Sequence, residues 1–354
     1  MTGRPQGWAR LARDLPDAVT LRTVALAGAG VAVFALLSLP LPWMLGPMFA
    51  CLIGALAGMR LQGLPRIAEG MRSVLGVAVG AAITPAVVGR LDEMALSIAL
   101  LPAFILVVGA VSYPYFHRFW GFDRATSYYA AMPGGLQDML IYGEEAGADP
   151  RRLSLIHVTR VLIVVSALPV LMIHVFGQNL DSPPGAAARE LPVDEMVLLA
   201  IVAVIGWQGA KAIGMFGASI LGPMLLAMAA SLADIIHQRP PAEAILAAQF
   251  FLGLGVGAKY AGITVAELRE SVTAALGQIA MLAAITFAFV EVVVLFGLAP
   301  PVEALLAFAP GGQAEMAIIA LVAGADVAFV VTHHIIRITV VIIGAPIAKR
   351  LMGW

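Results

Sequence analysis

Residues 132–139 (MPGGLQDM) return 177 positions later as residues 309–316 (APGGQAEM). The same offset relates the Gly-Ala-Asp run at 147–149 to the one at 324–326. An earlier run, LGPM at 45–48, returns at an offset of 176. A long duplication that keeps its Pro-Gly breaks and its charges within an apolar chain is typical of the core of membrane transporters.

The composition predicts a membrane protein. Hydrophobic residues make up 61% of the 354 residues and charged residues 12%, whereas a typical soluble domain has about 25% charged residues. Apolar runs of about 20 residues predict transmembrane helices. A net charge of −1 gives no basic field for nucleic acid, and a single cysteine excludes an internal disulfide or a Cys-based metal cluster. We therefore expect an all-α, polytopic protein in a lipid bilayer, with no cofactor, no metal and no direct nucleic-acid contact.

The apolar segments divide the chain into four parts. These are an N-terminal tail (1–21), a first transmembrane repeat (22–176), a linker (177–194) and a second transmembrane repeat (195–354). Arginines precede the first apolar run, and no small-residue cleavage site follows it, so we expect a retained first helix and a cytoplasmic tail. This indicates a multi-pass membrane protein with a cytoplasmic N-terminus.

The fifth apolar segment of each half, 124–146 and 302–323, contains a Pro-Gly-Gly run at its middle. Proline removes a backbone donor and glycine removes side-chain restraint, so a helix should break at both places. A broken backbone at membrane depth persists only where it is buried in protein or lines a water-filled cavity.

The break leaves two topologies open. If it is a re-entrant hairpin, each half crosses the membrane five times and the halves are inverted. If it is a kinked span, each half crosses six times and the halves are parallel. We favour the inverted arrangement, because paired broken segments are typical of inverted-repeat transporters.

The two breaks form the candidate binding site. A half-helix that follows a break presents free N–H groups and the positive end of its dipole, which favour an anion. Asp138 and Glu315 follow the two breaks at the same distance. Each carboxylate can cap its half-helix or can titrate during a transport cycle, and one residue can do both.

Arg160 and Arg337 lie inside apolar segments, each three residues after a histidine, His157 or His334. An arginine inside a span costs about 2.5–3.5 kcal/mol, so each needs a partner. The candidates are the carboxylates after the breaks, as a structural salt bridge, or an anionic substrate. The full set of candidate substrate-binding residues is Pro133, Gly134, Gly135, Asp138, Arg160, Pro310, Gly311, Gly312, Glu315, His334 and Arg337.

Two other patterns are weaker. Lys259 and Glu291 have no charged counterparts in the first half. They are candidates for a coupling pair, although snorkelling of the lysine is the favoured interpretation. Matched G-x-x-x-G motifs, at 76–80 and 253–257, predict close packing between spans or between the subunits of a homodimer.

The run at 309–316, together with Gly-Ala-Asp at 324–326 and THHIIR at 332–337, resembles the AbrB-type family of bacterial membrane proteins. The resemblance covers nearly the whole chain, because that family is itself a tandem duplication. The first half departs from the pattern, with Ile156 where the second half has His333. The resemblance implies a role as a regulator of gene expression and carries an older label of ammonia monooxygenase; the small soluble DNA-binding protein of the same name is distinct.

The sequence offers little for either label. It has no Gly-x-Ser-x-Gly, P-loop or HExxH motif and no histidine pair at i, i+4 spacing, so we expect no enzyme. A DNA-binding regulator needs a basic soluble module, for which there is no room. We therefore predict a secondary transporter of a small, anionic solute, driven by a proton or sodium gradient. The alternative is a membrane-embedded sensor that affects gene expression indirectly, without transport.

Overall fold

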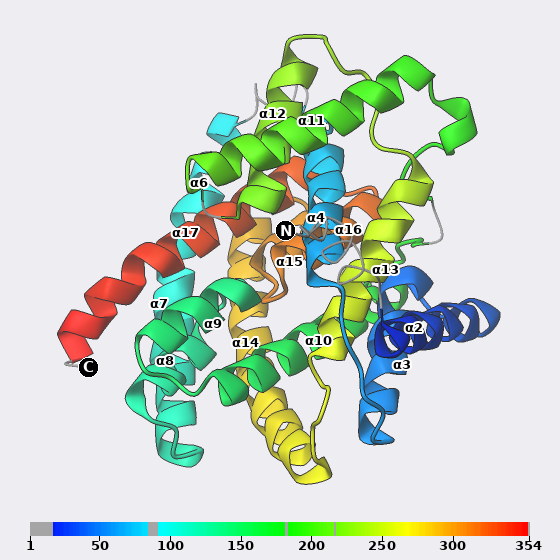
Figure 1. The fold of residues 1–354 in the computed structure, drawn as a ribbon. Coiled ribbons are helices and arrows are strands. Elements are labelled where there is room, and N and C mark those ends of the chain that lie inside the picture. Colours follow the sequence, from blue (N-terminus) through cyan, green and yellow to red (C-terminus); the bar gives the residue numbers. More distant parts are fainter. Residues whose placement is uncertain (1–16, 84–90, 181–182, 216, 353–354) are drawn as a thin grey trace, which may run out of the picture.

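The computed structural model describes residues 17–83, 91–180, 183–215 and 217–352, apart from the side chains of 91–93, 137–138, 345–346, 349 and 352. The described residues form helices joined by turns, with no β-strand among them (Figure 1). The predicted all-α class is therefore confirmed.

The helices of the two halves follow one another in matching order. The first half contains α2 (Ala18–Leu36), α3 (Pro42–Leu56), α4 (Pro65–Gly80), α6 (Leu91–Ala99), α7 (Leu101–Pro114), the short π-helix η1 (Tyr115–Phe119), α8 (Arg124–Ala131), α9 (Leu136–Glu145) and α10 (Pro150–His174). The predicted linker contains the 3-10 helix η2 (Ala188–Glu190) and the first two residues of α11 (Val193–Ala212). The second half contains the rest of α11, α12 (Ala218–Leu232), α13 (Ala242–Ala258), α14 (Val265–Leu295), α15 (Pro301–Phe308), α16 (Gln313–Val322) and α17 (Val327–Met352).

Within the described ranges, six helical stretches are long and apolar enough to cross a bilayer: Ala18–Leu36, Met94–Phe119, Pro150–His174, Val193–Ala212, Val265–Leu295 and Val327–Gly344. Four shorter apolar helices accompany them: α3, α12, α13 and α16. These lengths indicate a membrane protein, and the number of crossings stays a prediction.

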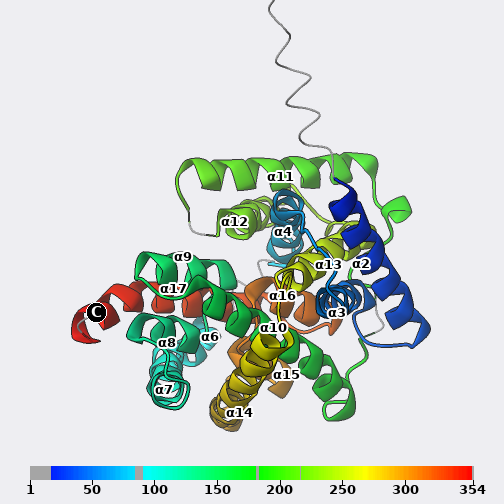
Figure 2. The ribbon, with the colours of Figure 1, turned by 60° about the horizontal axis from the view of Figure 1, so that its bottom comes forward.

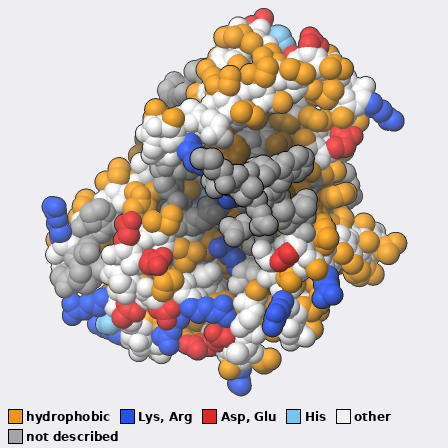
Figure 3. Space-filling model, in the orientation of Figure 1, with side chains coloured by type: hydrophobic (Ala, Val, Ile, Leu, Met, Phe, Trp, Pro, Cys, Tyr) orange, Lys and Arg blue, Asp and Glu red, His pale blue; other side chains and the backbone are white. Residues whose placement is uncertain are grey.

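The outer surface agrees with a lipid environment. Helix α11 exposes a row of large apolar side chains, for example Val197 (53% exposed) and Ile205 (58% exposed). In Figure 3, apolar side chains cover the band over α11, whereas charged side chains gather at the lower edge of the molecule. An apolar flank with charged ends is the pattern expected of a spanning protein.

Some helix boundaries differ from the predicted segments. Helix α2 begins at Ala18, inside the predicted tail, because the Asp17 side chain caps it by accepting the N–H of Thr20 at 2.8 Å. The predicted segment 94–116 is divided into α6 and α7. Pro102, near the start of α7, has no N–H to continue the ladder from α6.

The helices pack as two groups, of which the first lies mainly toward the top and right of Figure 2 and the second mainly toward the bottom and left. We call α2, α3, α4, α11, α12 and α13 the scaffold group, because they contact one another closely. We call α6 to α10 with α14 to α17 the broken-helix group, because it contains both Pro-Gly-Gly runs. The groups meet mainly where α4 contacts α16 and α17, and where α10 contacts α3 and α13.

The G-x-x-x-G motifs pack between the two halves of one chain. A Cβ added to Gly76 or Gly80 of α4 would collide with the backbone of α12, at the carbonyl oxygens of Ile220 and Met224. In the same way, a Cβ added to Gly253 of α13 would collide with a carbonyl of α3. Each glycine motif therefore packs against the Leu-Gly-Pro-Met helix of the other half, and the halves interlock.

Helices α4 and α13, which occupy equivalent positions in the two halves, run in opposite directions. A Cβ on Gly63, just before α4, would lie 3.5 Å from the Cβ of Ala258 at the end of α13. A Cβ on Gly255 would lie 3.9 Å from the Cβ of Ala68 in the first turn of α4. This antiparallel contact favours the inverted topology, which stays a prediction.

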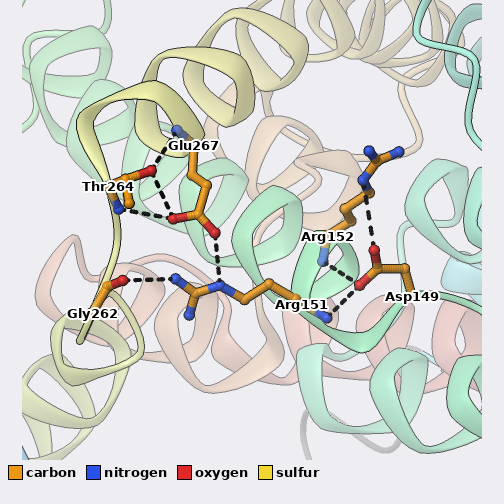
Figure 4. A network of polar contacts seen from close by, with 6 residues as sticks. All are labelled: Asp149, Arg151, Arg152, Gly262, Thr264 and Glu267. Atoms are coloured by element: carbon orange, nitrogen blue, oxygen red, sulfur yellow. Dashed lines mark hydrogen bonds and ion pairs between the residues drawn. The ribbon is translucent and has the colours of Figure 1, made fainter.

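A polar network at the start of α10 also joins the halves (Figure 4). Asp149, from the first Gly-Ala-Asp run, caps α10 by accepting two backbone N–H groups. Arg151 donates to the carboxylate of Glu267 at 3.3 Å and to the carbonyl of Gly262 at 3.3 Å. Glu267 in turn closes the capping box of α14 with Thr264. The motif therefore acts as a helix cap.

Candidate functional site

Both Pro-Gly-Gly runs interrupt a helix in the same way. Helix α8 ends at Ala131 and α9 begins at Leu136, while α15 ends at Phe308 and α16 begins at Gln313. The residues that flank each gap have extended backbones, with ψ of 136° at Met132 and 137° at its counterpart in the second half. Each break therefore leaves carbonyl oxygens without helical N–H partners.

The two buried arginines satisfy those carbonyl oxygens. Arg160 of α10 donates to Met132 O at 3.0 Å and to Gly134 O at 3.3 Å. Arg337 of α17 donates to the equivalent oxygens of Ala309, at 2.6 Å, and Gly311, at 2.9 Å. Both side chains are only 1% exposed. The planar guanidinium suits this task, because its fork of donors reaches two acceptors at once.

This partner was not among those that the sequence analysis considered. No described contact joins Arg337 to Glu315, and the guanidinium instead binds the backbone of the break. The side chain of Asp138 lies outside the described part of the chain, so its pairing with Arg160 stays a prediction. The physical reason is that a broken segment supplies orphan carbonyls in the interior, and these compete with any carboxylate.

Two histidines add to these contacts. We call Arg160, Arg337, His157 and His334 the arginine and histidine frame. His157 bonds through Nε2 to Tyr129 O at 3.0 Å, and His334 bonds through Nε2 to Leu306 O at 2.8 Å. His334 also accepts from Arg337 through Nδ1 at 2.9 Å. His333 faces elsewhere, toward Ser97 at 3.0 Å. These histidines position the helices before the breaks.

Helix α14 contacts the helix before each break, and the sequence did not predict these contacts. Gln278 donates to Ala130 O at 3.0 Å, at the end of α8. Thr286 donates to Phe308 O at 3.4 Å, at the end of α15. Their only signal in the sequence is polarity within the apolar segment 272–298. One helix therefore caps the ends of both broken helices.

A cavity of about 580 Å³ lies between the scaffold group and the broken-helix group. Both breaks reach it, through Gly134 and Gly135 of the first and Gly312 of the second. The proposed candidates Pro133, Pro310, Gly311, Arg160, His334 and Arg337 do not line it. Its lining from the scaffold group comes from residues of α4, α12 and α13 and the turns before α4 and α12.

Four helices begin at this cavity. The first residues of α9 and α16, Leu136 and Gln313, line it, and so do Pro65 at the start of α4 and Ser219 at the start of α12. The first turn of a helix has free N–H groups and the positive end of the dipole. These four helix starts favour negative charge, whereas the end of α13, which also lies at the cavity, opposes it.

Three charged side chains that the structure describes line the cavity: Arg72 of α4, Lys259 at the end of α13 and Glu315 of α16. Arg72 interacts electrostatically with the other two. The carboxylate of Glu315 folds back over Gly312 and its own backbone N–H, which is the predicted capping position. Glu291 is exposed on α14 and is not a lining residue, so the proposed pairing with Lys259 finds no support.

Methionines pack under the breaks, which is a second feature that the sequence analysis missed. A Cβ on Gly134 would lie 2.6 Å from the terminal methyl of Met139, and one on Gly311 would lie 2.5 Å from that of Met316. A side chain on the first glycine of either break would therefore require the methionine beside it to shift.

For the ranges that the structure describes, no group of three or more His, Cys, Asp and Glu residues is placed to hold a metal ion. The chemistry of the cavity comes from its two cations, one carboxylate and helix N-termini. These groups are suited to hold an anion and to exchange a proton. The protein is thus a polytopic helical membrane protein with two broken helices that reach one cavity.

The comparisons with known proteins give the family. The family model "Transition state regulatory protein AbrB" matches residues 43–353, so the chain belongs to the AbrB family. It is 28% identical to "Uncharacterized protein YhjN" of Bacillus subtilis (strain 168), over 93% of this chain and 92% of the relative. It is 24% identical to "Putative regulator AbrB" of Escherichia coli (strain K12), over 90% of this chain and 92% of the relative. The resemblance stated from the motifs is confirmed.

Proposed function

We propose that this AbrB-family protein is a secondary transporter of a small anionic solute, not an enzyme, and that the cavity between its two helix groups is the binding site. The observation that carries the proposal is that both Pro-Gly-Gly breaks open onto one cavity, together with two cationic side chains. Broken helices whose half-helix N-termini point at an anionic substrate are typical of secondary transporters.

The two helix groups provide a route for alternating access. Contacts are dense inside each group, and the cavity lies on the boundary between them. Sliding of one packed group against the other is a common transport motion. The arginine and histidine frame would keep each break rigid during that motion, because its bonds lie inside the broken-helix group.

Glu315 is the coupling residue in this proposal. Its carboxylate lines the cavity beside Arg72, so its protonation would change the charge that faces a bound anion. Proton coupling needs such a group, which charges and discharges during the cycle. The proposal also places the protein in the bacterial inner membrane, with inverted halves and a cytoplasmic N-terminus.

The alternative is a membrane sensor that binds a small anion without moving it. The relative called "Putative regulator AbrB" favours this alternative by its name alone. A sensor would act on gene expression through a partner protein, since the net charge of −1 gives no field for DNA.

Reconstitution into proteoliposomes distinguishes the two. Anion uptake that requires the protein and a pH gradient supports transport. Saturable binding without uptake would leave the sensor. Protein-free liposomes give the background.

A further inference from the structure

We propose that Lys259 is the side chain that pairs with the transported anion, and that this anion is a small organic monoanion, such as a monocarboxylate, with a short apolar body. The inference deepens the proposed function and relies on it for the location of the site. It does not depend on flux, because binding alone can test it.

Lys259 is placed at the cavity without a structural requirement for a lysine. It follows the last residue of α13 and lines the cavity. A lysine at a helix C-terminus also opposes the dipole, which is its ordinary role. However, α4, the equivalent helix of the first half, ends without a basic residue in its last turn, and position 82 is alanine. Helix termination therefore does not account for Lys259.

Among the charged side chains described at the cavity, the cations outnumber the carboxylates. Arg72 interacts with Glu315, and Arg72 and Lys259 repel each other. The three charged side chains described at the cavity therefore carry one positive charge in excess when Glu315 is ionised. Lys259 has no salt bridge with a described residue. An anion between Lys259 and the first turn of α16 would balance this excess.

Gln313 adds a donor to the same cavity. It is the first residue of α16 and lines the cavity, and its side-chain nitrogen is buried without a hydrogen-bond partner among the described residues. A buried unsatisfied donor costs about 1–3 kcal/mol. An oxyanion is an acceptor that would satisfy this amide together with the free backbone N–H groups of α16.

The shape and lining of the cavity favour an organic anion over an inorganic one. A volume of about 580 Å³ lies within the range of small-molecule sites, roughly 300–1,000 Å³. Apolar side chains from both helix groups also line the cavity: Leu136, Val161, Ile220, Leu252, Val256 and Ile338. These would contact the apolar body of the ligand.

The test is thermal unfolding of the purified full chain in detergent, with sodium butyrate and sodium propane-1-sulfonate as probes. Sodium chloride at equal ionic strength and neutral butyramide are the controls. We expect saturable stabilisation by at least one organic anion and none by butyramide. Lys259→Met should weaken this binding at least about tenfold, which is about 1.4 kcal/mol, and Lys259→Arg should keep part of it.

The matched control is Lys211→Met, which removes an exposed lysine of α11 outside the cavity and should bind like the parent. If Lys259→Met binds both probes like the parent, or if the parent responds to neither, the inference is wrong. If binding needs Lys259 but the protein carries no flux, the inference stands and transport is rejected. Flux that does not need Lys259 would keep transport and reject the inference.

A second measurement needs no variant at Lys259. Reductive methylation of the parent protein should modify Lys259 more slowly when butyrate is present, whereas Lys211 should be modified at an unchanged rate. Mass spectrometry of the peptides measures both. Equal modification of Lys259 with and without butyrate would overturn the inference, even if the methionine variant does not fold.

Discussion

At the first break, Arg160 donates to two carbonyl oxygens at 3.0 and 3.3 Å, and Nδ1 of His157 has no described hydrogen-bond partner. At the second break, Arg337 donates to the equivalent oxygens at 2.6 and 2.9 Å and also to Nδ1 of His334. The two frames therefore share one design, and the second has an additional bond between its arginine and its histidine.

The cavity uses the two halves differently. Position 136 is leucine where 313 is glutamine, position 82 is alanine where 259 is lysine, and Arg72 corresponds to a glutamine at 249. The frame that holds the breaks is thus duplicated, whereas Gln313, Lys259 and Arg72 at the cavity are not, although Glu315 keeps a carboxylate counterpart in Asp138. This difference indicates that the duplication supplies a scaffold, and that part of the ligand chemistry arises from residues that differ between the halves.

Loss of either frame arginine should have the largest effect. Arg337→Ala would leave two buried carbonyls and a histidine unsatisfied, which should cost on the order of 3–5 kcal/mol. Arg160→Ala should cost less, because its bonds are longer and it lacks the histidine contact. Thermal unfolding in detergent measures both, with Arg189→Ala, at an exposed site, as control. Equal and small losses would remove the frame from this account.

Filling the first glycine of each break should have the next largest effect. Gly134→Ala and Gly311→Ala place a methyl group against Met139 and Met316. Overpacking of this kind costs about 1–3 kcal/mol, and Met316→Ala should restore part of the loss in the second half. Gly28→Ala on α2 is the matched control, since a Cβ there meets nothing within 4 Å. Unfolding temperatures unchanged in both break variants would contradict the close packing.

The caps from α14 should have a smaller and unequal effect. Gln278→Leu removes the donor to the end of α8, at a cost of about 0.5–1.5 kcal/mol, which is the net contribution of a typical hydrogen bond. Thr286→Val removes a longer bond, 3.4 Å, from the end of α15 and should cost less. The comparison is made by thermal unfolding and by protease sensitivity at each break. If Thr286→Val is the more damaging of the two, α14 does not support the breaks as described.

The sequence could predict the features that depend on residues close together in the chain. Apolar runs predict the membrane helices, and Pro-Gly-Gly predicts the breaks, because both act on nearby backbone. Arg160 and Arg337 could be recognised as buried groups that need partners. Their partners could not be identified, because the carbonyls of the breaks become available only once α10 and α17 pack beside them.

The lining of the cavity is harder to predict from the sequence. Arg72, Lys259 and Glu315 come from three helices of two groups, and no spacing in the chain links them. Lys259 can be recognised from the sequence as a charge without a counterpart, but the sequence favours snorkelling as its explanation. The partners of the G-x-x-x-G motifs could not be predicted either, since each motif packs against a helix of the other half. Such contacts follow from how the duplicated halves interlock.

The most direct test of the account is uptake of labelled propane-1-sulfonate into proteoliposomes that carry a pH gradient, with the parent protein and Glu315→Gln. This anion stays charged, so it does not cross lipid as a neutral acid. The account predicts that the parent concentrates the anion, and that Glu315→Gln exchanges it across the membrane without concentrating it. Equal accumulation by the two proteins, or no uptake by the parent beyond protein-free liposomes, would contradict an anion transport site at this cavity.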